Sequence, residues 1–330
     1  MPLLQDFQIQ TGSFDIAIIA ATISILIGGI VFGIGIGFGI KRLRLVGAEE
    51  IAQGIISAAM LGGIISFAAI ADASVSSLVP AQALPVCPPI HAPTSSPFSF
   101  YSCFLYSYAN SFSSLAAQLY RCADIAGVAG SIQLKTGEIL FEPFFALRSY
   151  SQQLAELAAE FSTTAAIAAF ELEIALAVRD SALALFLPAG LLLRTFFATR
   201  RLGAAVMALS VSAYMVYPLI FLHSFQISKA LEATWQATEV AENFNKSFAS
   251  LPLLELDKPA AVKSKISQMA EGDFPGKVQI IFPTSNYALW MAKIDLIFYP
   301  LVSVIICAIA SLELYRLFSA QVFLSFIDTI

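Results

Sequence analysis

The chain has 330 residues, of which 58% are hydrophobic and only 12% are charged, and its net charge is −5. A soluble globular domain carries roughly twice that share of charged residues, and a disordered chain is poor in aromatic residues, whereas this one has 27 Phe and 10 Tyr. The composition therefore excludes disorder and argues against a protein that coats nucleic acid, and it predicts an all-α, polytopic membrane protein.

Five stretches are apolar over about the 20 residues that a membrane-spanning helix needs. They cover residues 14–40, 51–71, 175–198, 202–222 and 294–312. The first stretch is too long for the core of a signal peptide and no basic residue precedes it, so we expect it to be retained. The start of the last stretch is the least definite boundary, and an alternative start is Ala288.

Two short basic turns predict the orientation in the membrane. Lys41, Arg42 and Arg44 separate the first two spans, and Arg200 and Arg201 separate the third and fourth. Short basic loops stay in the cytoplasm. Both turns face the cytoplasm without contradiction, which predicts a multi-pass protein of the cell membrane with its N-terminus outside and its C-terminus inside.

This topology divides the chain into six segments. The predicted segments are an extracellular N-terminus (1–13), a two-span hairpin (14–71), an extracellular segment with cysteines, prolines and a long helix (72–174), a second two-span hairpin (175–222), an extracellular helical segment (223–287), and a last span with a cytoplasmic C-terminus (288–330).

Helical segments are also predicted outside the spans. No Gly or Pro interrupts residues 144–187, which predicts one long helix that begins outside and continues into the third span, with a kink at Pro188. Shorter helices are expected over 113–124, 228–248 and 261–269, while the proline-rich run 80–97 cannot be helical. Residues 98–130 leave open whether that region re-enters the membrane.

Three of the four cysteines, Cys87, Cys103 and Cys122, fall in the predicted outer region, where disulfides persist. An odd number allows at most one bridge among them, and the sequence does not choose the pair. Buried free thiols are the alternative, and a metal site is disfavoured because no CxxC spacing occurs. Cys307 is expected to pack inside the last span.

Small residues in the first span predict close helix packing. Gly29, Gly33 and Gly37 recur every four residues, a spacing that lets membrane helices approach each other. The neighbouring glycines loosely match a dinucleotide-binding loop, but they lie in an apolar run without the strand, turn and helix that such a loop requires.

Charged residues near the spans are informative because charge is costly in a bilayer. Interfacial snorkelling or local ion pairing is the favoured interpretation, while the lining of an oligomeric pore and a proton or ion relay are alternatives. The residues concerned are Glu171, Glu173, Arg179, Asp180, Lys293 and Asp295.

Other polar motifs are sparse. Arg194, before the second basic turn, can reach lipid headgroups or helix-end carbonyls, and the turn is interpreted as a topology anchor, with contact to a nucleic-acid backbone as the alternative. Asn245 begins an Asn-Lys-Ser glycosylation sequon. His91 and His223 lie on different segments, and no catalytic constellation or cofactor motif is recognisable, so we expect neither an enzyme nor a bound cofactor.

Two stretches resemble a family of archaeal polytopic membrane proteins. The first is a helical hairpin with the matching residues Leu187, Pro188, Gly190, Arg194, Phe196, Thr199, Arg200, Gly203, Tyr217 and Pro218. The second, Gly47 to Ile65, resembles that family's acidic start of the second span followed by a run of small residues. The family is similar to the Ced DNA-import membrane component and, through it, to the inner-membrane channel subunit of type IV secretion systems.

The resemblance implies a non-enzymatic channel or scaffold subunit of a DNA-transfer machine. Such a subunit would oligomerise among membrane lipids, work beside a separate ATPase and a pilin, and let DNA pass without sequence-specific binding. Two alternatives remain open, an accessory structural subunit of another membrane complex and a small-solute transporter, which would need a broken helix at its binding site.

Overall fold

The computed structural model describes residues 3–78, 97–136, 138–142, 144–195, 199–227, 229–248, 263–264, 267 and 273–319. The predicted features at Cys87, His91 and Phe196, and most of the helix expected over 261–269, lie outside these residues. The chain forms two compact units. Unit 1 comprises residues 1–103, 173–223 and 300–330, and unit 2 comprises residues 104–172 and 224–299.

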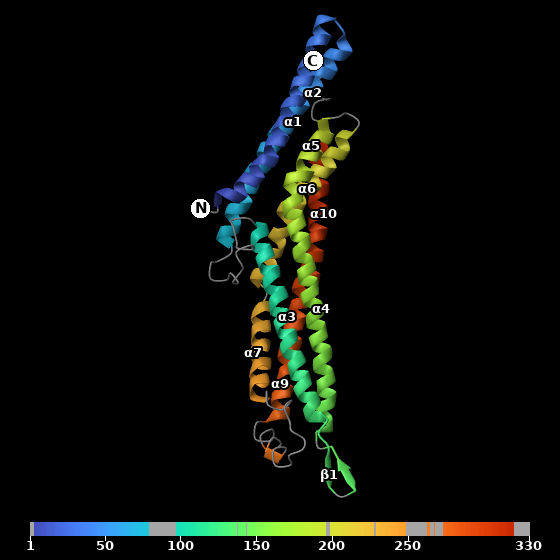
Figure 1. The fold of residues 1–330 in the computed structure, drawn as a ribbon. Coiled ribbons are helices and arrows are strands. Elements are labelled where there is room, and N and C mark those ends of the chain that lie inside the picture. Colours follow the sequence, from blue (N-terminus) through green and yellow to red (C-terminus); the bar gives the residue numbers. More distant parts are fainter. Residues whose placement is uncertain are drawn as a thin grey trace. The chain divides into compact units, whose positions relative to one another are not determined.

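Helices make up nearly all of the described chain (Figure 1), as the sequence predicts. The α-helices are α1 (Leu3–Gly37), α2 (Lys41–Leu78), α3 (Pro97–Gly130), α4 (Phe145–Ser181), α5 (Leu187–Thr195), α6 (Arg200–Ile227), α7 (Ala230–Phe248), α9 (Phe274–Lys293) and α10 (Tyr299–Ser319). The exception is a small antiparallel hairpin of β1 (Leu134–Thr136) and β2 (Ile139–Phe141).

Two helices begin earlier than the sequence predicts. Helix α3 starts at Pro97 and runs for 34 residues, whereas a helix was expected only over 113–124. Helix α9 starts at Phe274, well before the expected span at 294, with a proline in its first turn. Proline suits the first turn of a helix because its missing N–H has no intrahelical acceptor there. A proline therefore marks the start of both helices rather than a loop.

Two short π-helical segments lie inside the longest helices. Segment η3 (Ala182–Phe186) joins α4 to α5, and η6 (Ile294–Phe298) joins α9 to α10. Each ends two residues before a proline, Pro188 or Pro300. A proline ring collides with the carbonyl four residues earlier in a regular α-helix, and a wider turn relieves that collision. The kink expected at Pro188 is thus expressed as a π-helical segment.

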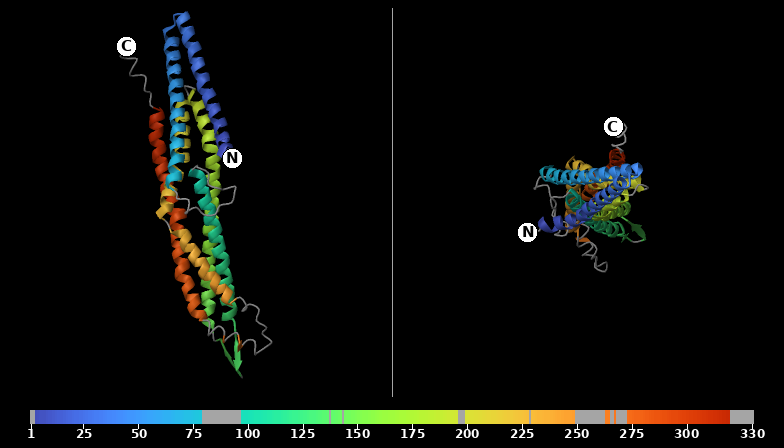
Figure 2. Two further views of the ribbon diagram at one scale, coloured as in Figure 1. Left: turned by 90° about the vertical axis from the view of Figure 1, so that its left-hand side faces the viewer. Right: turned by 90° about the horizontal axis from the view of Figure 1, so that it is seen from above.

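Unit 1 contains the α1–α2 hairpin (Figure 2), together with α5, α6 and the main part of α10. Glycines allow close approach of α1 and α2. A Cβ on Gly35 would lie 2.5 Å from the backbone nitrogen of Arg44, and one on Gly47 would lie 2.4 Å from that of Phe32. Gly39, in the turn, has a φ of +67°, which favours glycine.

The packing predicted for Gly29, Gly33 and Gly37 is not present. A Cβ added to any of the three would meet no described atom within 4 Å. The glycines that face α2 are instead Gly28 and Gly35, which are seven residues apart. A spacing of seven, two helical turns, keeps residues on one helix face over the length of the hairpin, so the predicted face was wrong by about one residue.

Unit 2 is a bundle built from α3, α4, α7 and α9, with aromatic side chains in its interior. Tyr108 and Phe112 of α3 are fully buried, and the Phe112 ring centroid lies 6.1 Å from that of Phe161 in α4. At the start of α9, the Phe274 ring packs against Phe248 at 4.6 Å and against Phe244 at 5.2 Å. The aromatic residues counted in the sequence therefore fill a helical core.

Three helices of the described chain are long and apolar enough to cross a membrane. They cover Lys41–Ile64, Phe145–Arg194 and Gly276–Ser319. A shorter apolar helix covers Ala21–Gly37. The long helix expected over 144–187 is part of the second of these, continuous in helical structure through η3. The membrane character predicted from composition agrees with these helices, whereas a count of five spans is not confirmed.

Candidate functional site: an arginine–glutamate cluster in unit 1

The site is built around the tight turn between α5 and α6. These helices pack backbone to backbone, because a Cβ on Gly203 would lie 2.5 Å from the carbonyl oxygen of Gly190 and from the nitrogen of Arg194. Across the turn, the hydroxyl of Thr199 donates a hydrogen bond of 2.6 Å to the carbonyl of Leu193, near the end of α5. This bond satisfies one of the carbonyls that a helix leaves open at its C-terminus.

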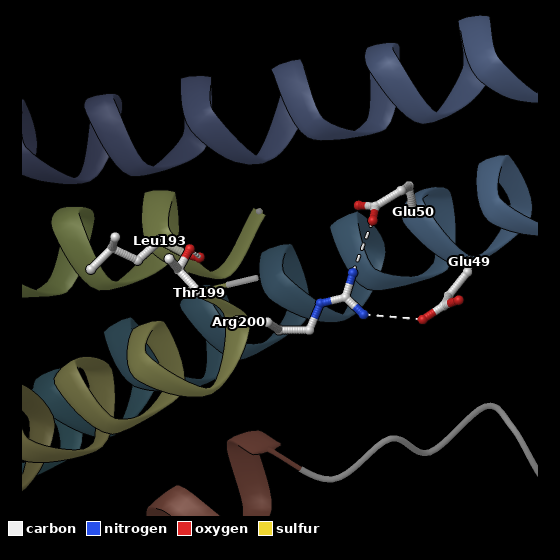
Figure 3. A network of polar contacts seen from close by, with 5 residues as sticks. All are labelled: Glu49, Glu50, Leu193, Thr199 and Arg200. Atoms are coloured by element: carbon white, nitrogen blue, oxygen red, sulfur yellow. Dashed lines mark hydrogen bonds and ion pairs between the residues drawn. The ribbon is translucent and has the colours of Figure 1, made fainter. Parts of the chain in front are cut away.

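Arg200, the first residue of α6, joins this turn to α2. One terminal nitrogen of its guanidinium lies 3.0 Å from a carboxylate oxygen of Glu49, and the other lies 2.9 Å from one of Glu50 (Figure 3). The Arg200 side chain is 11% exposed, against 35% for Glu49 and 21% for Glu50. A single planar guanidinium thus holds two neighbouring carboxylates, a geometry that suits arginine better than lysine.

Arg194 lies deeper in unit 1. It is only 4% exposed, and its Nη1 donates to the thioether sulfur of Met60 in α2 at 2.8 Å. Its Nε is buried and has no acceptor among the described residues. A thioether is a weak acceptor, so Arg194 is a buried cation with little direct compensation.

The arrangement can hold helices together through paired charges. Each of the two carboxylates accepts one bond from Arg200, so their charge is paired with the guanidinium. Over the described ranges of the chain, no three His, Cys, Asp or Glu residues gather to form a metal site. The cluster is therefore a charged clasp between the second hairpin and α2.

The two basic turns predicted to share one membrane side both belong to unit 1. Lys41, Arg42 and Arg44 are exposed at the start of α2, and Arg201 is exposed at the start of α6. Arg200 bonds to residues only two turns beyond Lys41 along α2. The sequence predicts Arg200 as a topology anchor, and Glu49 and Glu50 fall within the stretch Gly47 to Ile65 that carries the family resemblance. Their position directly after a basic turn was the signal available.

The charges predicted near the third span lie on α4. Arg179 donates from Nε to Asp180 at 2.8 Å, and both side chains remain accessible. Glu173 is exposed, whereas one carboxylate oxygen of Glu171 is buried and lacks a donor among the described residues. The four residues thus form one ion pair and two separate acids rather than a single cluster.

Lys293 and Asp295, both in unit 2, have different environments. The ammonium of Lys293 forms an exposed ion pair with Glu160 at 2.6 Å. Asp295 is 4% exposed, lies in the π-helical segment η6, and accepts a hydrogen bond from the hydroxyl of Tyr108. Local ion pairing, the favoured interpretation of the sequence, describes Lys293. Tyr108 was missed, since its position among many aromatic residues gave no signal of a buried acid.

Cys122 and Cys307 are buried free thiols. Cys122 Sγ lies 3.3 Å from Oδ1 of Asn245 and 3.6 Å from the carbonyl oxygen of Ala241, and burial raises the pKa of this thiol to about 12. Cys122 therefore does not take part in a bridge. A disulfide stays a prediction that concerns Cys103, which is buried, and Cys87, which lies outside the described residues.

Asn245, the predicted glycosylation residue, is a core residue of unit 2. It lies inside α7, is 8% exposed, and its amide nitrogen donates to the backbone carbonyl and the side-chain oxygen of Gln118 at 3.0 and 2.8 Å. A glycan on that nitrogen would replace these bonds. The folded structure therefore argues against glycosylation at Asn245, although the sequon itself is intact.

Comparison of the chain with protein-family models, with curated proteins and with solved structures gave no match. The class of protein consequently follows from the fold and the site alone. They define a helical protein with helices able to cross a membrane and with a charged clasp that joins two of its hairpins.

Proposed function

We propose that this chain is a membrane-embedded, non-catalytic channel or scaffold subunit of a DNA-transfer apparatus of the conjugation or type IV secretion kind. One observation carries the proposal. The two stretches with the family resemblance, 187–218 and 47–65, are far apart in sequence and meet through Arg200, Glu49 and Glu50. The two stretches that carry the resemblance are therefore joined directly by ion pairs in the folded chain.

In this proposal the chain crosses the membrane about five times, with both basic turns in the cytoplasm. The start of the last span supports one boundary. Trp290 and Tyr287 of α9 are 70% and 51% exposed, next to the ion pair of Lys293 with Glu160. Tryptophan and tyrosine favour the membrane–water interface. We assign this level to the outer interface, so that the outer part of α4, with α3 and α7, forms the extracellular helical region.

The partners follow from the family resemblance, and the lack of a recognisable phosphate-binding loop in the sequence agrees with them. A separate cytoplasmic ATPase would supply energy and a small pilin would assemble on the outer side. DNA would pass without sequence-specific contacts.

The direct test is deletion of the gene, followed by measurement of marker transfer between co-cultured cells. We expect transfer to be lost and then restored by the wild-type chain, and we expect a chain tagged at its C-terminus to co-purify with an ATPase in mild detergent. Normal transfer in the deletion strain would contradict the proposal. Co-purification with redox or cell-envelope subunits, without an ATPase, would favour the accessory structural subunit instead.

A small-solute transporter is the second candidate, and the π-helical segments favour it. Segments η3 and η6 each widen a long helix just before a proline, and such segments often mark functional positions. Asp295 in η6 is buried and accepts a bond from Tyr108. If this acid served a solute, Asp295→Asn would abolish uptake into proteoliposomes, whereas the DNA-transfer proposal requires no solute uptake.

A further inference from the structure

An ion pair lies on a largely apolar surface of unit 1, near the end of α4. The side chains of Arg179 and Asp180 are 38% and 65% exposed. Their exposed neighbours along the same helical segment include the apolar Ile174, Leu185 and Phe186 and, two turns before Asp180, the acid Glu173. The pair is therefore a small polar feature surrounded by side chains suited to lipid or protein.

The depth of this pair follows from contacts inside unit 1. Ser210 of α6 donates a hydrogen bond to the carbonyl of Ala182, two residues after Asp180. Ser210 lies ten residues after Arg200, and at 1.5 Å per residue this places it about 15 Å from the basic turn. A bilayer has a hydrocarbon core of about 30 Å. If the basic turn marks one surface, Arg179 and Asp180 lie near the middle of the bilayer.

The neighbouring helix α10 supports the same depth. Ser212 donates to the carbonyl of Cys307 at 2.6 Å, so this part of α10 is level with Ser210. The exposed side chains of α10 around Cys307 are aliphatic, among them Val304, Ile305 and Ile309. The charged pair thus shares its level with the side chains best suited to the hydrocarbon core.

Charges at such a depth are costly and normally face protein or water. An aspartate side chain is too short to extend to the membrane surface, as lysine and arginine can near helix ends. Each group also has unused capacity. Arg179 uses one N–H of five in its bond to Asp180, and a carboxylate accepts about four hydrogen bonds. Lipid offers nothing to complete these bonds.

We propose that the α4 face around Arg179 and Asp180 is a contact surface for a second copy of this chain. Adjacent positive and negative groups are self-complementary, so a symmetric partner can pair its Asp180 with Arg179 and its Arg179 with Asp180. The exposed Ile174, Leu185 and Phe186 would surround this double ion pair with apolar contacts. The inference rests on the membrane placement in the proposed function, and not on DNA as the cargo.

Cross-linking in native membranes tests this surface. Ala177 is exposed one turn before Asp180, so Ala177→Cys leaves the ion pair intact. The matched control is Leu209→Cys, which is 59% exposed at a similar depth on α6. A short bismaleimide should give a covalent dimer with Ala177→Cys at least fivefold above the wild-type chain and the control. Equal yields at both positions, or cross-links only to a different protein, would overturn the proposal.

Charge exchange provides an independent readout. Arg179→Asp and Asp180→Arg, each alone, should reduce the oligomeric fraction measured by native mass spectrometry several-fold, and the double exchange should restore it. A monomeric wild-type chain in lipid nanodiscs would overturn the proposal, as would oligomers unaffected by the single exchanges. Normal DNA transfer in the deletion strain, together with an intact cross-link at Ala177→Cys, would contradict only the proposed function. The two failures are therefore distinguishable.

Discussion

Arg200 determines how the two hairpins of unit 1 are joined. Its guanidinium bridges two carboxylates that are consecutive in sequence, each through a separate nitrogen. Lysine has a single ammonium and lacks the planar fork that makes this bridge. The cluster is partly screened, since Glu49 keeps 35% of its side chain exposed, so its effect on stability is smaller than that of a fully buried ion pair.

Arg200→Ala should therefore lower the free energy of unfolding by about 2 kcal/mol, because Glu49 and Glu50 would then repel each other without a cation between them. Arg200→Lys should lose roughly half as much. Thermal unfolding of the purified protein in detergent measures both effects. Arg201→Lys, at an exposed neighbouring position, is the control and should leave the unfolding temperature unchanged. Unfolding of Arg200→Ala at the wild-type temperature would contradict the clasp.

Cys122 predicts an alkaline limit to stability. Burial raises its pKa from 9.0 to about 12, so the native state keeps the proton over a range in which the unfolded chain releases it. Its contribution to stability is complete below about pH 9 and declines as the pH rises toward 12. The thiolate is also the reactive form of cysteine. In the native protein at pH 8, Cys122 should resist alkylation.

Alkylation followed by peptide mass spectrometry identifies each cysteine separately and gives this prediction its measurement. Cys122 should become labelled only after denaturation. In Cys122→Ser the decline of stability above pH 9 should be shallower than in the wild-type chain. Rapid labelling of native Cys122 at pH 8 would show that the contact with Asn245 does not exclude solvent.

At the scale of the helices, the α1–α2 hairpin depends on which glycines face the partner helix. Gly35→Ala would place a methyl group 2.5 Å from the backbone of Arg44, and backbone cannot move aside without separating the helices. We expect a loss of about 1–3 kcal/mol. Gly33→Ala, two residues away, meets open space and should be neutral or slightly stabilising, because alanine favours helix.

Resistance to limited proteolysis in detergent, compared between these two variants, measures the difference directly. Equal resistance of Gly33→Ala and Gly35→Ala would contradict the observed hairpin packing. Greater damage from Gly33→Ala would support the face that the sequence spacing suggested.

The helices were predictable to different degrees. Long apolar runs predict helices well, and the continuous helix after residue 144 followed from the lack of Gly and Pro. The start of α3 was missed because Pro97 was assigned to a non-helical run, and the start of α9 at Phe274 was missed because the last span was expected only from 294, although proline fits a first helical turn. The spacing of apolar residues in the sequence gave no indication of the π-helical segments. They arise from the collision of Pro188 and Pro300 with the preceding turn, which a pattern of apolar residues does not express.

The candidate site was predictable only in part. The basic residue Arg200 was identified from the turn, but its acceptors lie some 150 positions earlier in the chain, and no local pattern links them. The same limit applies to Asp295 and Tyr108, which are 187 positions apart. Residues that titrate or form ion pairs can be selected from the sequence, whereas their partners depend on tertiary packing.

At the scale of the whole molecule, the account depends on the placement of its helices in a membrane. Lys41–Ile64, Phe145–Arg194 and Gly276–Ser319 are each suited to cross it. The basic turns at Arg42 and Arg201 belong to one unit and are connected through Arg200. Short basic turns remain in the cytoplasm. In the proposed topology the β1–β2 hairpin belongs to the extracellular segment 72–174.

The most direct measurement is labelling of single introduced cysteines with a membrane-impermeant maleimide, with the wild-type chain as background. Arg42→Cys and Arg201→Cys should react only after the membrane is permeabilised, whereas Glu138→Cys, in the turn between β1 and β2, should react in intact cells. Reaction of Arg42→Cys and Arg201→Cys from opposite sides of the membrane, or reaction of all three positions from the same side, would contradict the account.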